Sequence, residues 1–288
     1  MQESSGRVVH CSYIILQYGC PRMGESGSVA FIQLPQIEIT SMPSFASPSS
    51  FLHTALNLLF PTPCASCSVP LWDDPVPYFC QACWATLIPI SGPCCPHCGG
   101  PFASPVAVQH SPAHECGACR THPPAFTQTW SLFPYQSPLK EAITLFKYRG
   151  KRSLTKHLLQ AMVPTLPILP AFDVIIPVPL HPHRLREREY NQSLLLAHGL
   201  SQHLQIPLLL SCLLRIRSTV PQTFLSKRER LTNLRRAFAV HEASRITGTR
   251  ILLIDDVFTT GTTLHECAKA LRTAGSGPVY GLTLARML

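Results

Sequence analysis

The sequence predicts an α/β protein in which a parallel β-sheet with helices follows a small cysteine-rich domain. The continuous apolar run at 251–254 (ILLI) is typical of a strand buried on both faces of a parallel sheet, and the mainly apolar stretch at 171–180 (AFDVIIPVPL) predicts a second buried strand. Each of the two stretches is followed by a polar segment and then by a predicted helix. Four Cys-x-x-Cys pairs lie within 64–119, ahead of both strands. The pattern therefore predicts two domains of different kinds.

The length and composition fit this division. A chain of 288 residues suits one large domain and one small one, and we expect a poorly ordered extension over 1–50, a cysteine-rich domain over 51–125 and an α/β domain over 130–288. Hydrophobic residues make up 45%, without an uncharged apolar run of about 18 residues, so no membrane insertion is predicted. The N-terminus does not resemble a secretion signal, and we expect a cytoplasmic protein.

The positive charge is concentrated in one part of the chain. The formal net charge is +9, and residues 130–245 carry 17 Lys and Arg against 6 Asp and Glu. Such an excess suits a polyanionic partner, either a phosphate-bearing small molecule or a nucleic acid. A solubilising surface is the alternative.

The cysteine pairs predict two structural zinc sites. A Cys-x-x-Cys turn directs two thiolates toward one point, and two such turns complete a tetrahedral site. Disulfides do not suit a cytosolic chain, and one iron–sulfur cluster would leave four cysteines over. Pairing by sequence neighbours assigns Cys64, Cys67, Cys80 and Cys83 to one zinc ion, and Cys95, Cys98, Cys116 and Cys119 to the other. A cross-braced pairing is left open by the spacing, and Cys94 is not assigned as a ligand.

The C-terminal half alternates between strand and helix patterns. Strands are predicted at 130–135, 207–214, 238–240 and 279–284, in addition to the two apolar runs. Amphipathic helices are predicted at 51–60, 138–148 and 194–204, and a basic helix within 215–236. The helix at 138–148 ends in the basic segment KYRGKR, which either completes an ordinary helix C-terminus or faces phosphate.

A candidate anion site follows the strand at 251–254. The apolar run stops at Asp255 and Asp256, and the loop at 259–263, Thr-Thr-Gly-Thr-Thr, precedes a predicted helix. Small residues let the backbone close around a phosphate, hydroxyls add donors, and a helix N-terminus attracts anions. Paired carboxylates can accept bonds from a sugar diol or hold Mg²⁺. The alternative is a simple helix cap, although capping needs only one such residue.

The segment IDDVFTTGTTL resembles the phosphoribosyl-pyrophosphate (PRPP) signature of type I phosphoribosyltransferases. The resemblance implies a type I phosphoribosyltransferase-like parallel sheet and Mg²⁺ bound together with PRPP. It also implies that Asp255 and Asp256 bind the ribose hydroxyls and that the loop binds the 5′-phosphate, through Thr259, Thr260, Gly261, Thr262 and Thr263. The competing nucleotide loop GxxxxGK[ST] would require a lysine after Gly261, and none is present.

A wider resemblance links both halves of the chain. VIIPVPL followed by an arginine-rich segment and Asn-Gln, together with KYRG at 147–150, resembles the ComF family of competence-related proteins, which carry an N-terminal zinc domain. Gln222-Thr223, Arg230-x-x-Asn233 and Ala237-Phe238 fit the same pattern. The family implies a role in DNA uptake, with single-stranded DNA and competence-machinery proteins as partners.

The ComF resemblance also implies further ligand-binding residues. The loop after the PVP strand, including Val178 and Pro179, corresponds to a pyrophosphate region, and Arg188, Asn191 and Gln192 to a flexible cover over the site. Glu189 stands where the family has glycine, which puts the local turn in doubt. Asn191 and Gln192 either contact the ligand or cap the following helix.

The basic segment 215–236 interleaves cations with aromatic and polar residues, a combination that suits single-stranded nucleic acid. The candidate nucleic-acid residues are Lys227, Arg228, Arg230, Arg235 and Arg236. A solvated helix beside a phosphate pocket is an equal alternative. No acceptor site for a phosphoribosyl group is recognisable, and no catalytic residue is assigned. Three functions therefore stay open. The protein is a phosphoribosyltransferase, or a DNA-binding or scaffold module, or a protein whose zinc ribbons bind a partner and whose C-terminal domain has lost its ligand.

Overall fold

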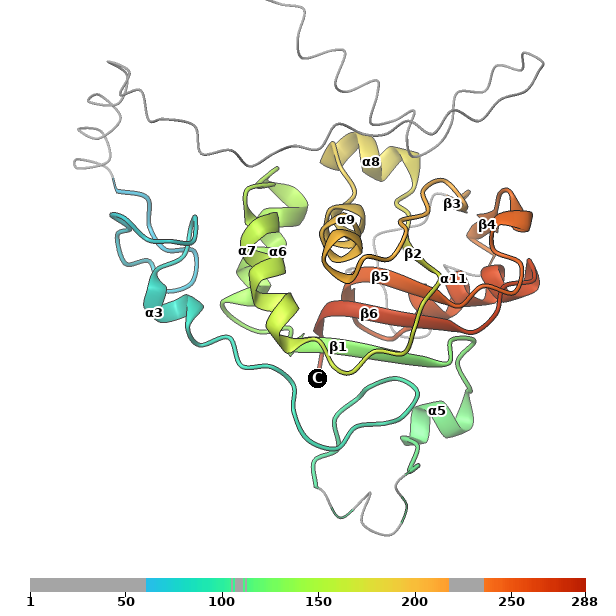
Figure 1. Cartoon of the computed structure of the whole chain (residues 1–288). Helices are drawn as coiled ribbons and strands as arrows, with labels where there is room; N and C mark the ends of the chain where they lie inside the picture. Colours follow the sequence, from blue (N-terminus) through green and yellow to red (C-terminus); the bar gives the residue numbers. More distant parts are fainter. Residues whose placement is uncertain (1–60, 105, 107–110, 112, 218–235) are drawn as a thin grey trace, which may run out of the picture.

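The computed structural model describes residues 61–104, 106, 111, 113–217 and 236–288 (Figure 1). Three predictions lie largely outside these residues: the extension at 1–50, the helix at 51–60 and the basic helix within 215–236. Of the five candidate nucleic-acid residues, only Arg236 is described.

The predicted parallel α/β sheet is confirmed. Its strands are β1 (Gln128–Pro134), β2 (Val174–Pro177), β5 (Ile251–Phe258) and β6 (Val279–Arg286), and they are hydrogen-bonded in the order β1-β6-β5-β2. All three pairings are parallel. The last strand of the chain, β6, lies in the interior of the sheet between β1 and β5.

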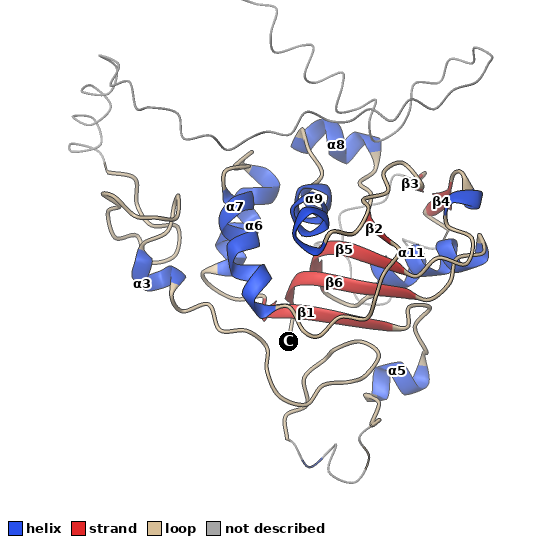
Figure 2. Ribbon diagram, in the orientation of Figure 1, coloured by secondary structure: helices blue, strands red, loops and turns tan. Residues whose placement is uncertain are grey.

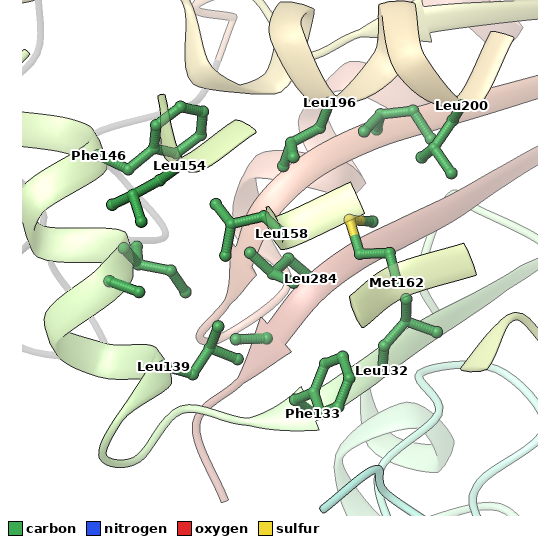
Figure 3. Close-up of a cluster of buried hydrophobic side chains, with 14 of the residues drawn as sticks. Leu132, Phe133, Leu139, Phe146, Leu154, Leu158, Met162, Leu196, Leu200 and Leu284 are labelled. Atoms are coloured by element: carbon green, nitrogen blue, oxygen red, sulfur yellow. The ribbon is translucent and has the colours of Figure 1, made fainter. Parts of the chain in front are cut away.

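Helices cover both faces of this sheet (Figures 1 and 2). On one face, α6 (Leu139–Tyr148), α7 (Leu154–Met162) and α9 (Gln192–Leu204) pack against β5 and β6 through a large apolar cluster, part of which is drawn in Figure 3. On the other face, α11 (Thr262–Thr273) packs through Leu264, Cys267, Ala268 and Leu271. Because alternate β5 residues enter the two clusters, the strand is apolar throughout its first half.

Some elements differ from the sequence prediction. Helix α7 and the short α8 (Pro182–Arg188) were not predicted, although Leu154, Leu158 and Met162 of α7 are spaced by four residues. The predicted strand at 207–214 is divided. Its start hydrogen-bonds to Ile175 of β2, whereas β3 (Leu213–Arg215) pairs antiparallel with β4 (Phe238–Val240) in a separate two-stranded sheet. Two 3₁₀ turns are also present, Val163–Thr165 after α7 and Ala243–Arg245 after β4.

The cysteine-rich part packs closely against the sheet domain. It contains the short helices α3 (Gln81–Trp84) and α5 (Gly117–Thr121). Its first half joins the apolar cluster beneath α6 and α7 through Val76 and Phe79, and its second half joins the α11 cluster through Cys95, Cys98 and Cys119. The backbone of this part also hydrogen-bonds to β1, from Ile90 N to Leu132 O (2.8 Å) and from Thr129 N to His97 O (2.7 Å). The cysteine-rich part therefore shares its apolar packing with the sheet domain.

Within the described part of the chain, no helix has the length and apolar character needed to cross a membrane.

Candidate functional site: an acidic pair and a glycine-led loop at the sheet edge

The two strands that carry the candidate residues end side by side. Strand β2 pairs with β5 so that Pro177 is level with Ile254, and Val178 N donates to Ile254 O at 2.9 Å. Val178 and the following Pro179 therefore lie beside Asp255. Contrary to expectation, β5 does not stop at the acidic pair but runs on to Phe258, because its ladder with β6 continues through Asp255 and Val257. Both carboxylates are thus held on a strand rather than in a loop.

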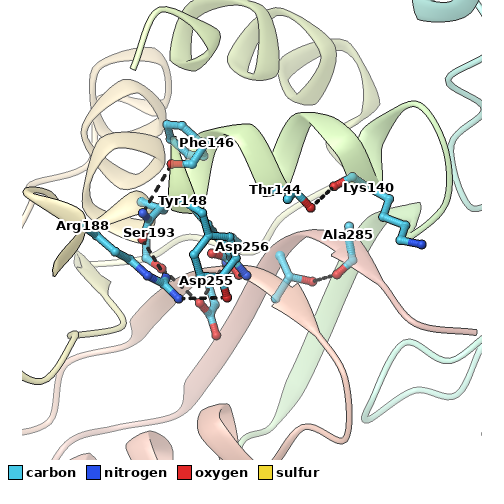
Figure 4. Close-up of polar contacts among 12 residues, drawn as sticks. Lys140, Thr144, Phe146, Tyr148, Arg188, Ser193, Asp255, Asp256 and Ala285 are labelled. Carbon is cyan, nitrogen blue, oxygen red and sulfur yellow. Dashed lines mark hydrogen bonds and ion pairs between the residues drawn. The ribbon is translucent and has the colours of Figure 1, made fainter. Parts of the chain in front are cut away.

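Each carboxylate of the acidic pair has its own protein partners (Figure 4). Asp255 Oδ1 accepts hydrogen bonds from Ser193 Oγ (3.0 Å) and from the backbone N–H of Asp256 (2.9 Å). Asp256 Oδ1 lies 2.7 Å from Lys147 Nζ, and both side chains of this ion pair are largely buried. Helices α6 and α9 thereby fix the two acids from the same face of the sheet.

The environment of Asp255 opposes its ionisation. Burial and the neighbouring charge of Asp256 raise the pKa of Asp255 to about 7, although Lys147 and the bonds from Asp256 N and Ser193 act in the opposite direction. Two adjacent carboxylates with one close ammonium leave one negative charge incompletely compensated. The site is therefore ready to receive a hydrogen-bond donor or a cation.

The 259–263 loop turns sharply before α11. Gly261 has φ +76°, in the left-handed region, and a Cβ at this position would lie 2.6 Å from Phe258 Cζ. The hydroxyls of Thr260 and Thr262 lie 2.8 Å apart, and Thr262 opens a twelve-residue helix. Glycine is thus required by both the backbone and the close ring, and it lets α11 begin at the same end of the sheet as the acidic pair.

The predicted cover residues lie between α8 and α9. Arg188 donates to Gln192 Oε1 (3.2 Å) and to the Tyr148 hydroxyl (3.4 Å), and its guanidinium lies over the Tyr148 ring. Asn191 is fully buried, caps α9 through Ser193 N and donates to Val178 O. Gln192 donates to Phe146 O at 3.4 Å. Asn191 therefore does cap the helix, and its amide joins the end of β2 to the start of α9.

Glu189 occupies a backbone position that favours glycine, since it ends α8 with φ +65°. Glu189→Gly is therefore expected to stabilise the protein by about 1 kcal/mol, because the left-handed conformation strains a side-chain-bearing residue. The exposed ion pair of Glu189 with Arg152, at 3.9 Å, offsets little of this gain. Urea unfolding measures the effect. Glu187→Gln, a charge change without a backbone change, is the control, and equal stability of both variants would contradict the interpretation.

Several residues at the site were not among the predicted ligand-binding residues. Lys147 was noted only as part of a basic segment that faces phosphate or ends a helix, and the structure places it on Asp256. Ser193 contacts Asp255, and Tyr190, which is fully buried, hydrogen-bonds to Phe146 O while Arg152 lies over its ring. The KYRG pattern could have indicated Lys147, whereas Ser193 carries no distinguishing sequence signal.

The eight paired cysteines form two groups, and the pairing by sequence neighbours is confirmed. Within each group the sulfur atoms all lie within 4.8 Å of one another. The first group comprises Cys64, Cys67, Cys80 and Cys83, and the second comprises Cys95, Cys98, Cys116 and Cys119. Cys94 is exposed and belongs to neither.

Both cysteine clusters fit a bound zinc ion. Burial disfavours the charged thiolate of Cys64, but bonds from the backbone N–H groups of Cys67 and Cys80 outweigh it and lower its pKa to about 6. In the second cluster, burial and the neighbouring sulfur atoms raise the pKa of Cys119. Four thiols so close together cannot all ionise without a cation, and a tetrahedral Zn²⁺ ion supplies the missing charge. The two clusters are consistent with two zinc sites.

Comparison with known proteins agrees with this architecture. Residues 55–120 match the family model of the double zinc ribbon domain, and residues 191–279 match that of the phosphoribosyl transferase domain. These matches fall inside the two predicted domains, whose exact boundaries stay predictions. Fold and cysteine clusters thus define a protein with an N-terminal double zinc ribbon and a phosphoribosyltransferase domain of the type I fold.

The sequence relatives identify the family. The chain is 34% identical over 203 residues to competence protein F of Haemophilus influenzae, covering 68% of this chain and 86% of that protein. It is 34% identical over 202 residues to DNA utilization protein YhgH of Escherichia coli K12 (67% and 84%), and 31% identical over 213 residues to competence protein ComFC of Bacillus subtilis (72% and 83%). The chain belongs to the ComF/YhgH family.

Among solved structures, the chain is similar to glutamine phosphoribosylpyrophosphate amidotransferase from B. subtilis, with a TM-score of 0.30 and 25% identity. The similarity covers 47% of this chain, which spans about a quarter (26%) of the amidotransferase.

Proposed function

We propose that this protein binds PRPP or a closely related phosphoribosyl ligand. The observation that carries the proposal is the meeting of the acidic pair and the glycine-led start of α11 at one edge of the sheet, where open α/β sheets bind their ligands. Asp255 and Asp256 would accept hydrogen bonds from the ribose hydroxyls. The N–H groups and hydroxyls of the 259–263 loop would hold the 5′-phosphate.

The pyrophosphate would lie beside the end of β2. Val178 and Pro179 border Asp255 there, and Arg188 supplies a cation whose Nε is buried without a hydrogen-bond partner among the described residues. Mg²⁺ bound with PRPP would neutralise part of the pyrophosphate charge, and carboxylate oxygens suit this ion. The close contact of Lys147 with Asp256 supports the view that the acidic pair attracts positive charge.

We further propose a role in DNA uptake or use, in the cytoplasm. The relatives' names refer to competence and DNA utilization. Clusters of reduced thiolates suit a reducing compartment, which supports the expected location. The proposal concerns ligand binding. No described residue is assigned as the base that an acceptor would require.

Calorimetric titration of PRPP with Mg²⁺ into the zinc-loaded protein tests the proposal. We expect saturable binding near one equivalent per chain, with ribose 5-phosphate and inorganic pyrophosphate each competing for part of the site. Absence of saturable heat at millimolar PRPP, with both zinc ions in place, would overturn it. Release of pyrophosphate in the presence of a panel of bases and amines would then show whether binding leads to transfer.

A DNA-binding module is the second candidate, favoured by the charge excess over 130–245 and by the relatives' names. Lys227, Arg228, Arg230 and Arg235 lie outside the described residues, and Arg236 contacts Glu266 through its backbone N–H. Affinity for single-stranded DNA as a function of salt tests this candidate, since several phosphate contacts give a steep decline. A flat dependence, or no binding at low salt, would exclude it.

A further inference from the structure

Arg286 connects the second cysteine cluster to the carboxyl ends of the strands, where the candidate site lies. It ends β6, where it is level with Phe258 of β5. Its Nη1 donates to Cys98 O at 2.7 Å, and its Nη2 lies 3.6 Å from Cys98 Sγ. A cluster cysteine and a residue 188 positions later are thereby joined through one guanidinium group.

The same guanidinium group holds the ring that supports the loop. It lies over the Phe258 ring, 4.2 Å from the ring centroid. Phe126, which follows the second cluster, meets this ring edge-on at 6.5 Å. The far tip of the ring approaches Gly261 so closely that a Cβ there would lie 2.6 Å from Cζ. The position of Phe258 therefore limits the conformation of the 259–263 loop.

The cluster side of this connection is equally tight. A Cβ on Gly100 would lie 2.9 Å from Arg286 Nη2 and 3.3 Å from Cys98 Sγ, so the backbone at Gly100 passes close to the guanidinium group. A second link runs parallel to it, since Ala125 N donates to His265 Nδ1 of α11 at 3.1 Å. Movement of the second ribbon would consequently be transmitted to the start of α11.

We propose that Arg286 is a positioning residue that couples the second cysteine cluster to the 259–263 loop. The intact cluster holds the guanidinium group, the guanidinium group fixes the Phe258 ring, and the ring keeps Gly261 in the turn that aims the N–H groups of the loop. Loss of the cluster's metal or oxidation of its thiols would loosen this turn. The effect on phosphoribosyl ligands rests on the proposed function, whereas the coupling to the loop itself does not.

Arg286→Met tests the coupling, because methionine keeps apolar contact with the ring but cannot donate to Cys98. The variant should retain two zinc ions per chain while amide exchange in the first hydrogen-bonded turn of α11, at 265–268, accelerates about tenfold, a coupling of ordinary size. The reporting amide nearest the loop is His265 N, which donates to Gly261 O at 2.9 Å. Affinity for PRPP and for ribose 5-phosphate should fall by a similar factor, with affinity for inorganic pyrophosphate unchanged. Arg286→Lys, which retains one donor, should recover part of the protection, and Arg272→Met on the exposed end of α11 should behave like the wild type.

Gly100→Ala perturbs the contact between Arg286 and Cys98 from the ribbon side and should give the same exchange pattern. This variant therefore tests the coupling if Arg286→Met fails to bind two zinc ions. Unchanged exchange at 265–268 in both zinc-loaded variants would overturn the proposal. If the wild type binds no PRPP, the proposed function fails, and the exchange measurements still confirm or reject the coupling.

Discussion

Cys95→Ser is expected to lose one of two bound zinc ions and to unfold far more easily than the wild type. Cys95 is 1% exposed, and its sulfur accepts a hydrogen bond from Cys116 N at the centre of the second cluster. The cluster forms part of the apolar core beneath α11, so its collapse disturbs the sheet domain as well. Because structural zinc contributes directly to folding, we expect the free energy of unfolding to fall by roughly 4 kcal/mol or more.

Cys94→Ser is the matched control for this change. The two cysteines are adjacent in sequence, but Cys94 is exposed and lies outside both clusters, so its substitution should alter stability by less than about 0.5 kcal/mol. Metal analysis and thermal unfolding of both variants measure the difference. Two zinc ions and an unchanged transition in Cys95→Ser would contradict the assignment, and iron in place of zinc would reinstate the iron–sulfur alternative.

Asp255→Asn is expected to stabilise the ligand-free protein above neutral pH while abolishing PRPP binding. Asparagine can still accept the bonds from Ser193 and Asp256 N through its Oδ1, but it removes the charge that burial and Asp256 disfavour. A neutral amide is a weaker acceptor for ribose hydroxyls than a carboxylate. Stability and ligand binding should therefore change in opposite directions, as is common for functional carboxylates.

The pH dependence gives this prediction its sign. The folded-state pKa of Asp255, about 7, lies above its usual value of 3.8, so the stability contribution is full below about pH 4 and is lost as the pH rises through 7. Between pH 5 and pH 8 the wild type should lose roughly 2–3 kcal/mol relative to Asp255→Asn. Urea unfolding at several pH values measures this difference. Asp73→Asn, at an exposed carboxylate, should show no such trend, and parallel pH profiles for Asp255→Asn and the wild type would refute the argument.

The sequence predicted those parts of the fold that have a strong local signal. The buried strands β2 and β5 and the helices α6, α9 and α11 are visible because their apolar spacing matches their period. Strand order was not predictable, since the central place of β6 depends on contacts between segments about 150 residues apart. The length of β5 was also missed, because polar Asp255 and Asp256 interrupt the apolar run although the ladder continues.

The residues predicted from the motif lie together at the carboxyl end of β5, but the side chains that hold the acidic pair in place come from distant helices. Lys147 and Ser193 belong to helices whose positions are set only by tertiary packing. For the same reason the contacts of the cysteine-rich part with the sheet domain were not predicted. Its spacing predicted the pairing of ligands, whereas its contacts with both sheet faces depend on residues far along the chain.

Two backbone hydrogen bonds join the cysteine-rich part to β1, since Ile90 N donates to Leu132 O and Thr129 N donates to His97 O. Without the zinc ribbons, Thr129 N and Leu132 O would lose the partners that now satisfy them at the outer side of β1. An unsatisfied strand edge invites pairing with another chain. A phosphoribosyltransferase domain without its zinc ribbons should therefore self-associate. Because each half covers backbone and apolar groups of the other, we expect the two halves to be inherited together.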